Sequence, residues 1–541
     1  MKYDWSNPYP TVRSPVMARH VVATSHPLAS QAGLRMMLKG GNAIDAAIAA
    51  AAALTIVEPV SNGLGSDAFA ILWDGSQLHG LNSSGVAPSG WTPDYFERQH
   101  GGQIPLRGWD SVTVPGAVAS WVAMSERFGA LPFADLMEPA IELAEGGHAV
   151  GLIVADKWAR AVPQLHHQPG FDRAFMPRGR APQPGEWFTF AEAGHTLRRI
   201  ADTRGEAFYR GEVAEAIATF ARDHGAQLSV ADLAAHRADW VTPIQQDFAG
   251  HTVHEIPPNG QGIAALMALG MLQHLDIGRL PVDSVESQHL QIEAMKLAFA
   301  DTYRWVADER HMTQVSAADL LSDGYLRERA RLIDPQRAQV LGAGQPPKGG
   351  TVYLTTADAQ GRMVSFIQSN YLGFGSGVVV PGVGVSLQNR GHGFTTKPGH
   401  PNQVAPGKRP FHTIIPGFVT RGGKPVFSFG VMGGDMQPQG HVQILCNIID
   451  FAMNLQEAGD APRFRHAGSS EPEGTVMSDG GTLFLESGVD AEVVRDLIRR
   501  GHRVSRSASE FGGYQGIWID WERRVLIGAS ESRKDGCAIG Y

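Results

Sequence analysis

Hydrophobic and polar positions along the chain predict a helical first part and a strand-rich last part. Residues 46–57 are apolar except for Thr55 and are rich in alanine. A segment that is apolar on every side predicts a buried helix, and this one is shorter than the ~20 residues that cross a bilayer. A preceding helix is expected to begin at Pro27, a residue tolerated in a first helical turn, and to end at Gly40. These two helices should form a helical hairpin.

The middle of the chain carries apolar residues at spacings of three and four, which is typical of helices that cover a core. Helices are predicted at residues 116–128, 135–145, 263–275 and 285–306, after a short strand at 70–73. The pattern changes near residue 335, and the Gly- and Pro-rich residues 342–350 predict an exposed, flexible stretch. Strands are predicted beyond it at 351–356, 363–367, 413–415 and 426–429, with a helix near 441–453. This order along the chain, with helices first and hairpins second, favours an α+β fold or two domains.

Composition and charge narrow the classes of protein that fit this pattern. The 541 residues are 43% hydrophobic and 18% charged, which excludes a disordered chain and favours two halves or one large layered unit. The net charge of −8 and the lack of a basic cluster argue against nucleic acid and membranes as partners. The two cysteines, Cys446 and Cys537, are too few for a disulfide framework, and the first residues do not read as a secretory signal. We therefore expect a cytoplasmic protein.

The Gly- and Pro-rich stretch ends at Gly349 and Gly350, immediately before Thr351. The hydroxyl of Thr351 is a candidate nucleophile. If the Thr351 hydroxyl attacked the Gly350 carbonyl, the chain would break and Thr351 would become a new N-terminus. That residue would hold both a nucleophile and a base, its own α-amine, whose ordinary pKa is about 8. Glycine before it leaves the carbonyl open to attack. The alternative is that these residues only begin an edge strand.

Several further motifs occur in a fixed order along the chain. They lie at residues 40–47, 57–59, 114–116, 350–355, 407–410, 433–434, 460–464 and 528–533. With them the chain resembles the gamma-glutamyltranspeptidase superfamily of N-terminal nucleophile hydrolases over nearly its whole length. Any one motif is weak, whereas the ordered set is specific.

The resemblance implies an α+β fold, a four-layer αββα sandwich, and a precursor that cleaves itself. Residues 1–350 would form a large, mostly helical fragment and residues 351–541 a small one, intertwined as a heterodimer. It also implies that Thr351 is the nucleophile, that Ser369 supplies a second hydroxyl, and that Gly433 and Gly434 form the oxyanion hole. Taken alone, the two glycines also fit a simple turn.

The chain departs from the family where the substrate's glutamyl head is held. Ser84 stands in place of the arginine that grips the α-carboxylate in better-known members. The stretch 389–394 lacks the two aspartates that hold the α-amine. Because a hydroxyl cannot form the bidentate, charge-assisted pair of a guanidinium, ordinary gamma-glutamyl recognition should be weakened or replaced.

Five residues are candidates for a different substrate pocket. Arg390 could hold the acidic end of a smaller acyl group, or it is a surface or salt-bridge arginine. His412, which with Thr413 replaces a serine pair of the family, could donate a hydrogen bond or titrate, or it is a satisfied structural histidine. Tyr371 falls where the family keeps a substrate-binding asparagine, and Asn370 lies one place earlier.

We therefore expect an autoprocessing amidohydrolase or acyltransferase of the gamma-glutamyltransferase type that cleaves a gamma-glutamyl or related amide. The substrate is a small-molecule amide, and water or an amine resolves the acyl-threonine intermediate. One alternative is a different enzyme, either a hydrolase of small amide acids such as oxamate or a cephalosporin-acylase-like enzyme. The other alternative is a non-catalytic scaffold. The mechanism needs no cofactor and no metal, and neither His166 with His167 nor His251 with His254 has partners at zinc-site spacing. Further association of the heterodimers is left open.

Overall fold

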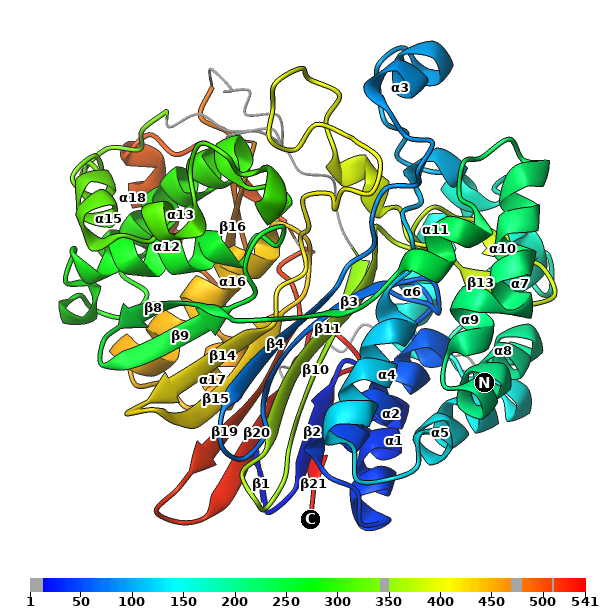
Figure 1. Ribbon diagram of the computed structural model, residues 1–541. Coiled ribbons are helices and arrows are strands. Elements are labelled where there is room, and N and C mark those ends of the chain that lie inside the picture. The colour runs from blue at the N-terminus through cyan, green and yellow to red at the C-terminus, as the bar shows by residue number, and fades with distance from the viewer. Residues whose placement is uncertain (1–12, 341–349, 469–478, 508–509) are drawn as a thin grey trace.

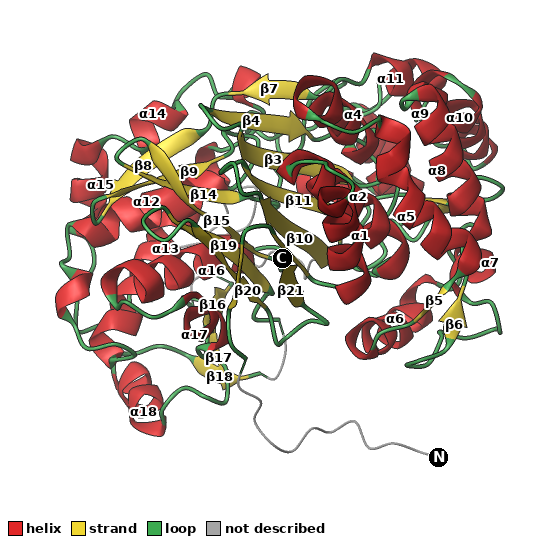
Figure 2. Cartoon of the chain, turned by 90° about the horizontal axis from the view of Figure 1, so that it is seen from below, coloured by secondary structure: helices red, strands yellow, loops and turns green. Residues whose placement is uncertain are grey.

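Two β-sheets packed face to face form the centre of the molecule, and helices cover the outer face of each (Figure 1). This architecture comes from a computed structural model, which describes residues 13–340, 350–468, 479–507 and 510–541. The view from below shows the same order of layers, helix, sheet, sheet and helix (Figure 2). The predicted α+β fold, a four-layer αββα sandwich, is confirmed.

Each large sheet has seven strands among the described residues. The first sheet runs in the order β21 (Cys537–Gly540), β2 (Val21–Thr24), β10 (Gly350–Ala357), β11 (Met363–Tyr371), β3 (Asp67–Trp73), β4 (Leu78–Ser83) and β7 (Asp239–Val241). The second runs in the order β1 (Val16–Ala18), β20 (Val525–Ser530), β19 (Tyr514–Asp520), β15 (Lys424–Val431), β14 (Gly417–Arg421), β9 (His251–Glu255) and β8 (Ile244–Phe248). Neighbouring strands in both sheets are antiparallel.

Both sheets mix strands from the two sides of Gly350. In the first sheet β10 and β11 lie between β2 and β3, so later strands are enclosed by earlier ones. In the second, β1 lies at one edge and β8 and β9 at the other, with later strands between them. A cut before Thr351 would therefore leave two pieces joined by the hydrogen bonds of both sheets.

The helical layer over the first sheet is built around α2 (Ala43–Val57), whose residues are all buried. It packs between the sheet and α1 (Pro27–Leu38), α4 (Ala117–Phe128) and α5 (Phe133–Gly146) (Figure 1). Asn42 begins α2 with a capping box, in which its side chain accepts from the Asp45 N–H at 3.1 Å while the Asp45 side chain accepts from the Asn42 N–H at 2.8 Å. The small alanine side chains let this helix lie close against the sheet, which confirms the predicted buried helix.

The layer over the second sheet consists mainly of α12 (Gly262–Gln273), α13 (Val285–Trp305) and α16 (Met436–Leu445). A separate apolar core lies between the two sheets and includes the buried side chains of Phe69, Tyr353 and Ile367. Burial of such side chains is worth roughly 1.5–3 kcal/mol each, so the sheet-to-sheet contact is a main source of stability.

Most predicted elements are present, and the structure also differs from the prediction in several places. Residues 413–415 are not a strand, because the Ile415 N–H donates to the Gln437 side chain at 2.9 Å and the Thr413 carbonyl accepts from Gln261 at 2.6 Å. The helix expected near 441–453 begins earlier, as α16, and continues as a π-helical turn at Cys446–Asp450. Of the strands in the two large sheets, β3, β10, β11 and β15 correspond to predicted strands, and the others were not predicted.

Two sequence predictions concern other features of the chain. The flexible stretch expected at 342–350 lies outside the described residues except for Gly350, and Gly349 lies outside them as well. Within the described ranges, every helix is too short or too polar to span a lipid bilayer.

Candidate active site

The predicted nucleophile Thr351 lies near the start of β10, at an irregularity in its pairing with β11. Gly350 pairs with Tyr371 and Val352 with Gln368, so two residues of β11 lie opposite Thr351 alone. A bulge of this kind redirects a side chain and is frequent beside active sites. The Thr351 side chain is nearly buried, with 2% of the residue exposed.

Ser369 is the residue that the bulge brings to the nucleophile. Its Oγ lies 3.2 Å from Thr351 Oγ1, within hydrogen-bond distance for two hydroxyls. The Tyr371 N–H donates to Ser369 Oγ at 2.7 Å and so fixes the serine side chain. The predicted second hydroxyl therefore contacts the predicted nucleophile.

Gly433 and Gly434 form a short loop between β15 and α16. Their φ angles, +118° and +64°, lie in the region that favours glycine. Among the residues that the structure describes, neither backbone N–H has a hydrogen-bond partner. The N-terminus of α16 follows at once, and its dipole favours negative charge at this point. The loop is a turn, as the simpler interpretation had it, and it also offers two N–H groups to an oxyanion.

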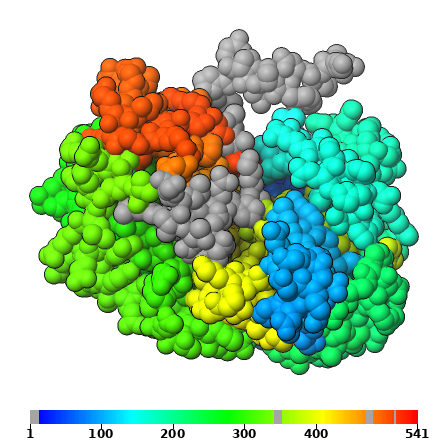
Figure 3. Space-filling view, turned by 90° about the horizontal axis from the view of Figure 1, so that it is seen from above, coloured from blue at the N-terminus to red at the C-terminus, as the bar shows by residue number. Residues whose placement is uncertain are grey.

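Thr351 and Gly433 line the same cavity, of about 500 Å³, together with Met432 and Phe374. This volume is within the range of small-molecule sites. The cavity wall also includes charged side chains from distant parts of the chain: Arg107, Asp156, Lys157, Arg160, Asp435, Arg465, Glu486, Glu510, Arg533 and Lys534. In the view from above, the cyan segment containing α6 (Leu152–Leu165) and the orange segment containing α18 (Ala491–Arg499) lie on opposite sides of one face (Figure 3).

Arg390 is fully buried behind Tyr371. Its Cζ lies 4.3 Å from the centre of the Tyr371 ring, and its Nη1 donates to Thr413 Oγ1 at 2.7 Å. Its Nε and Nη2 have no hydrogen-bond partner in the described part of the chain. Burial lowers the pKa of Arg390 to about 10, with Asp67 acting in the opposite direction, so the guanidinium stays charged. An incompletely paired buried cation is a candidate anion site.

His412 is part of a buried pair with Asp67. Its Nε2 lies 3.1 Å from Asp67 Oδ2, and its Nδ1 accepts from the Ile414 N–H at 3.4 Å. Burial lowers the pKa of His412 well below the usual value and raises the pKa of Asp67 to about 7. A neutral histidine that donates through Nε2 fits both contacts. The geometry favours the structural alternative for this residue.

Asn370 and Ser84 are also held by the protein itself. The Asn370 side chain accepts from Ser66 Oγ at 2.8 Å and donates to Ser386 Oγ at 3.3 Å. Ser84 Oγ donates to Asn82 Oδ1 at 2.8 Å. Neither residue lines the cavity that contains Thr351. The structure thus brings together Thr351, Ser369 and Gly433, with Tyr371, Arg390 and Thr413 as a second group beside Gly350.

Apart from Arg533, which lies in the motif at 528–533, the charged residues of the cavity wall were not predicted from the sequence. Arg107 donates to the carbonyl of Gly373 at 2.8 Å and to that of Gly375. Lys157 lies on α6, and Lys534 lies between β20 and β21. No local motif joins residues so far apart in sequence, so only the fold could reveal them.

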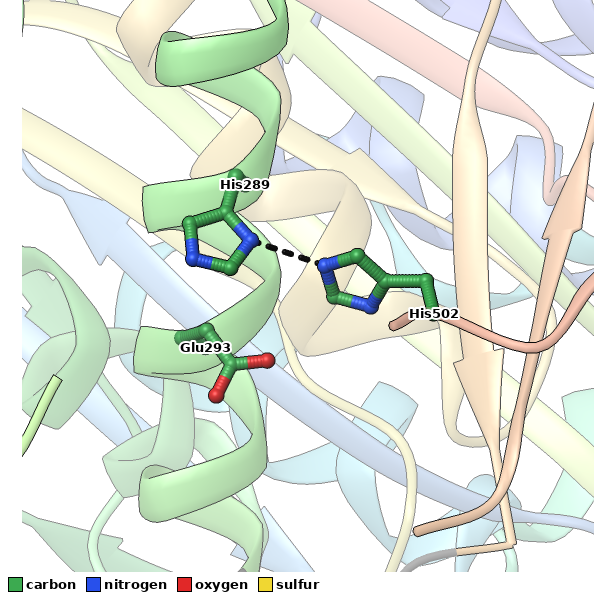
Figure 4. Close-up of side chains that lie close together, drawn as sticks. All are labelled: His289, Glu293 and His502. Carbon is green, nitrogen blue, oxygen red and sulfur yellow. Dashed lines mark hydrogen bonds between the residues drawn. The ribbon is translucent and has the colours of Figure 1, made fainter. Parts of the chain in front are cut away.

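One group of side chains has the types of a metal site, namely His289, Glu293 and His502 (Figure 4). Their ligand atoms lie within 4.8 Å of one another, and His289 Nδ1 lies 2.8 Å from His502 Nε2. The Lys296 ammonium, however, lies 2.7 Å from Glu293 Oε1 and supplies the positive charge that a metal would bring. The Gln339 N–H donates to Glu293 Oε2 at 3.2 Å, so the group holds the chain that leads toward residue 350.

The αββα sandwich, with strands from both parts of the chain in each sheet, is that of an N-terminal nucleophile hydrolase. A family model described as gamma-glutamyltranspeptidase matches residues 29–541. The chain therefore belongs to the gamma-glutamyltranspeptidase family and is an enzyme of this hydrolase and transferase family.

Three relatives indicate the range of activities in the family. The crystal structure of a cephalosporin acylase from Bacillus halodurans has a TM-score of 0.93 and 45% identity, covering 100% of this chain and 99% of the other. A glutathione hydrolase-like proenzyme of Bacillus subtilis is 34% identical over 98% of this chain and 99% of its own. An oxamate amidohydrolase proenzyme of Klebsiella pneumoniae is 35% identical over 98% of this chain and 99% of its own.

Proposed function

We propose that the protein is an autoprocessing acylase that uses Thr351 to hydrolyse small amides whose acyl group ends in a carboxylate. The observation that carries the proposal is the cavity that Thr351 shares with Gly433, whose N–H and that of Gly434 have no described partner. The hydroxyl contact between Thr351 and Ser369 supports it. The relatives' names, acylase and amidohydrolase, agree with this reaction class.

Processing would begin with attack of Thr351 Oγ1 on the Gly350 carbonyl carbon. The Gly350–Thr351 C–N bond then breaks, and the acyl group passes to the threonine oxygen as an ester. Water hydrolyses this ester and leaves a carboxylate on Gly350 and a free amine on Thr351. Residues 1–350 and 351–541 would stay together as a heterodimer, because each sheet contains strands of both.

In turnover the free amine of Thr351 would take the hydroxyl proton as Oγ1 attacks the substrate's amide carbon. The N–H groups of Gly433 and Gly434 would stabilise the oxyanion, a contribution of about 3 kcal/mol for one well-placed donor. The amide C–N bond breaks, the proton passes to the leaving amine, and water or another amine then attacks the acyl-threonine ester.

The unpaired nitrogens of Arg390 favour a substrate whose acyl group has a carboxylate at its far end. Two of its nitrogen positions, Nε and Nη2, lack partners among the described residues. It is buried behind Tyr371, which pairs with Gly350 in the uncleaved chain. Cleavage would free Gly350 to move away and would open the space opposite Tyr371. Oxamate is itself an amide with a carboxylate, which agrees with the name of one relative.

A gamma-glutamyl donor is the second candidate. It carries an α-ammonium as well as a carboxylate, and it would need an acid to pair with. Asp435 lines the cavity, and its Oδ2 has no hydrogen-bond partner in the described chain. Arg465 lies 3.5 Å from that oxygen and already offsets its charge, so this site is weaker than a dedicated ammonium pocket.

Three 4-nitroanilides with the same leaving group test the proposal. Butanoyl lacks the carboxylate, glutaryl adds it, and γ-glutamyl adds the α-ammonium. We expect kcat/KM for glutaryl to exceed both others at least tenfold, and a Thr351→Ala variant to be inactive. Equal rates for the butanoyl and glutaryl anilides would show that Arg390 does not bind the acyl carboxylate. If the γ-glutamyl anilide were hydrolysed fastest, a gamma-glutamyl donor would be favoured. A cleaved protein that turns over no amide, oxamate included, would point to the scaffold alternative.

A further inference from the structure

Lys157 and Lys534 form a cationic part of the cavity wall, and neither forms an ion pair with a described residue. Lys157 lies on α6, Lys534 follows β20, and both line the cavity that contains Thr351. In the described residues neither ammonium has a carboxylate oxygen within 4 Å. Nearby acids have other partners: Asp156 pairs with Arg160 at 2.6 Å and Glu486 pairs with Arg533 at 2.6 Å.

The two lysines interact with each other. Burial, followed by the neighbouring charge of Lys157, lowers the pKa of Lys534 to about 7, while Glu58 and Glu531 act in the opposite direction. Glu58 is itself held by the hydroxyls of Ser25 and Ser61 at 2.5 and 2.9 Å. Two like charges in a partly buried site destabilise the free protein, and an anion placed between them would remove that cost.

The position of Lys534 connects this wall to the proposed oxyanion loop. A Cβ added to Gly513 would lie 2.6 Å from Lys534 Cε, so the lysine packs directly on that glycine. The preceding residue, Gly512, packs on Gly433, since a Cβ at Gly433 would lie 3.2 Å from Gly512 Cα. The Lys534 side chain is therefore separated from the loop by two glycines that carry no side chain.

Arg107 adds to the same cavity a third positive charge that has no ion pair among the described residues. Its guanidinium donates to the carbonyls of Gly373 and Gly375, and in the described chain it forms no ion pair. Arg107, Lys157 and Lys534 are together called the cationic wall. It is distinct from the position of Arg390, which lies behind Tyr371 and does not line the cavity.

We propose that the cationic wall binds a carboxylate on the amine half of the substrate, the half that leaves when Thr351 is acylated. This inference rests on the proposed function, because it assigns the two halves of the amide to two sides of the nucleophile. The substrate class is then an amide with an acidic group on both halves, one facing Arg390 and the other facing Lys157 and Lys534.

The test compares two glutaryl anilides that differ only in the leaving group, 4-nitroaniline and 3-carboxy-4-nitroaniline. In the wild type we expect kcat/KM to be at least tenfold higher for the carboxylated anilide. Lys157→Met and Lys534→Met should each reduce this ratio, and the double variant should bring it close to one. Lys424→Met, at an exposed position at the start of β15, is the matched control and should keep the ratio.

Several results would overturn the inference. One is a wild-type ratio near one, and another is a ratio that the lysine variants do not change. A third is an Arg390→Met variant that alters the leaving-group ratio while the lysine variants alter the preference for glutaryl over butanoyl. If the lysine variants fail to fold, Lys534→Arg should keep the ratio of the wild type.

A binding measurement separates failure of the inference from failure of the proposed function. The free amine 3-carboxy-4-nitroaniline should bind the wild type at least tenfold more tightly than 4-nitroaniline, whether or not either anilide is hydrolysed. Absence of turnover with this difference in binding would reject the proposed reaction and keep the anion site. Turnover without any difference in binding would reject the anion site and keep the reaction.

Discussion

The Arg390→Met substitution removes one buried positive charge and keeps an unbranched, though shorter, side chain. In the described chain the guanidinium has one hydrogen bond, to Thr413, and a face contact with Tyr371. Its Nε and Nη2 lack partners there and would be the donors to the acyl carboxylate. The substitution therefore removes the proposed substrate contact and little of the surrounding network.

The expected loss follows from the number of free donors. A hydrogen bond to a charged group is worth about 1.5–3 kcal/mol, so two of them are worth roughly 3–6 kcal/mol before the carboxylate's desolvation is subtracted. A net loss of about 3–4 kcal/mol corresponds to a 10²- to 10³-fold decrease in kcat/KM, since ~1.4 kcal/mol is tenfold. Arg390→Lys keeps the charge but loses the two-pronged geometry, so its decrease should be about tenfold.

The assay is hydrolysis of glutaryl and butanoyl 4-nitroanilide by wild type and variant. The loss should appear with glutaryl, whereas butanoyl turnover should stay within about threefold, because it has no carboxylate to lose. The thermal unfolding midpoint and the extent of chain cleavage serve as controls for folding. An equal loss with both donors would refute the assignment of Arg390 to the acyl carboxylate.

Other parts of the site give three further predictions. Ser369→Ala should slow turnover about tenfold, the value of one neutral hydrogen bond to Thr351, whereas Ser365→Ala on the same strand should not; equal effects would exclude a specific role. Gly433→Ala forces a side chain onto a φ of +118° and should lower kcat at least 100-fold, and unchanged kcat would contradict the oxyanion role. Because the pKa of Lys534 is about 7, its charge is present below that pH and lost above it. Preference for the carboxylated anilide should therefore decrease between about pH 6 and about pH 8.5, and Lys534→Met should remove this dependence.

Helices were predictable where local sequence and burial agree. The alanine-rich helix α2 is apolar on every side because the structure buries every side, and its start is fixed by Asn42 and Asp45 within the segment itself. Helix α1 begins at Pro27, as predicted. In both cases the signals needed to place the element lie within a few residues of it.

Other elements depend on distant partners and could not be predicted. Residues 413–415 look like a strand, yet their backbone groups bond to the side chains of Gln261 and Gln437. Strands β8 and β9 form an edge of the second sheet, and pairing with β14, far along the chain, helps to hold them. The residues near each of these segments in the sequence do not indicate these long-range contacts.

The residues of the candidate site were also predictable only where a local motif marks them. Thr351, Gly433 and Gly434 were predicted from motifs, and their assigned roles remain predictions. The buried partner of His412, Asp67, comes from a distant strand, so its pairing could not be foreseen. The cationic wall has no motif, because α6 and the segment after β20 meet only in the folded chain.

Self-cleavage before Thr351 is tested by the intact mass and the N-terminal sequence of the purified protein. We expect two fragments, residues 1–350 and 351–541, with the smaller beginning at Thr351, and one uncut chain for Thr351→Ala. A wild-type protein that hydrolyses its substrate as a single uncut chain, or a cut at any other bond, would contradict it.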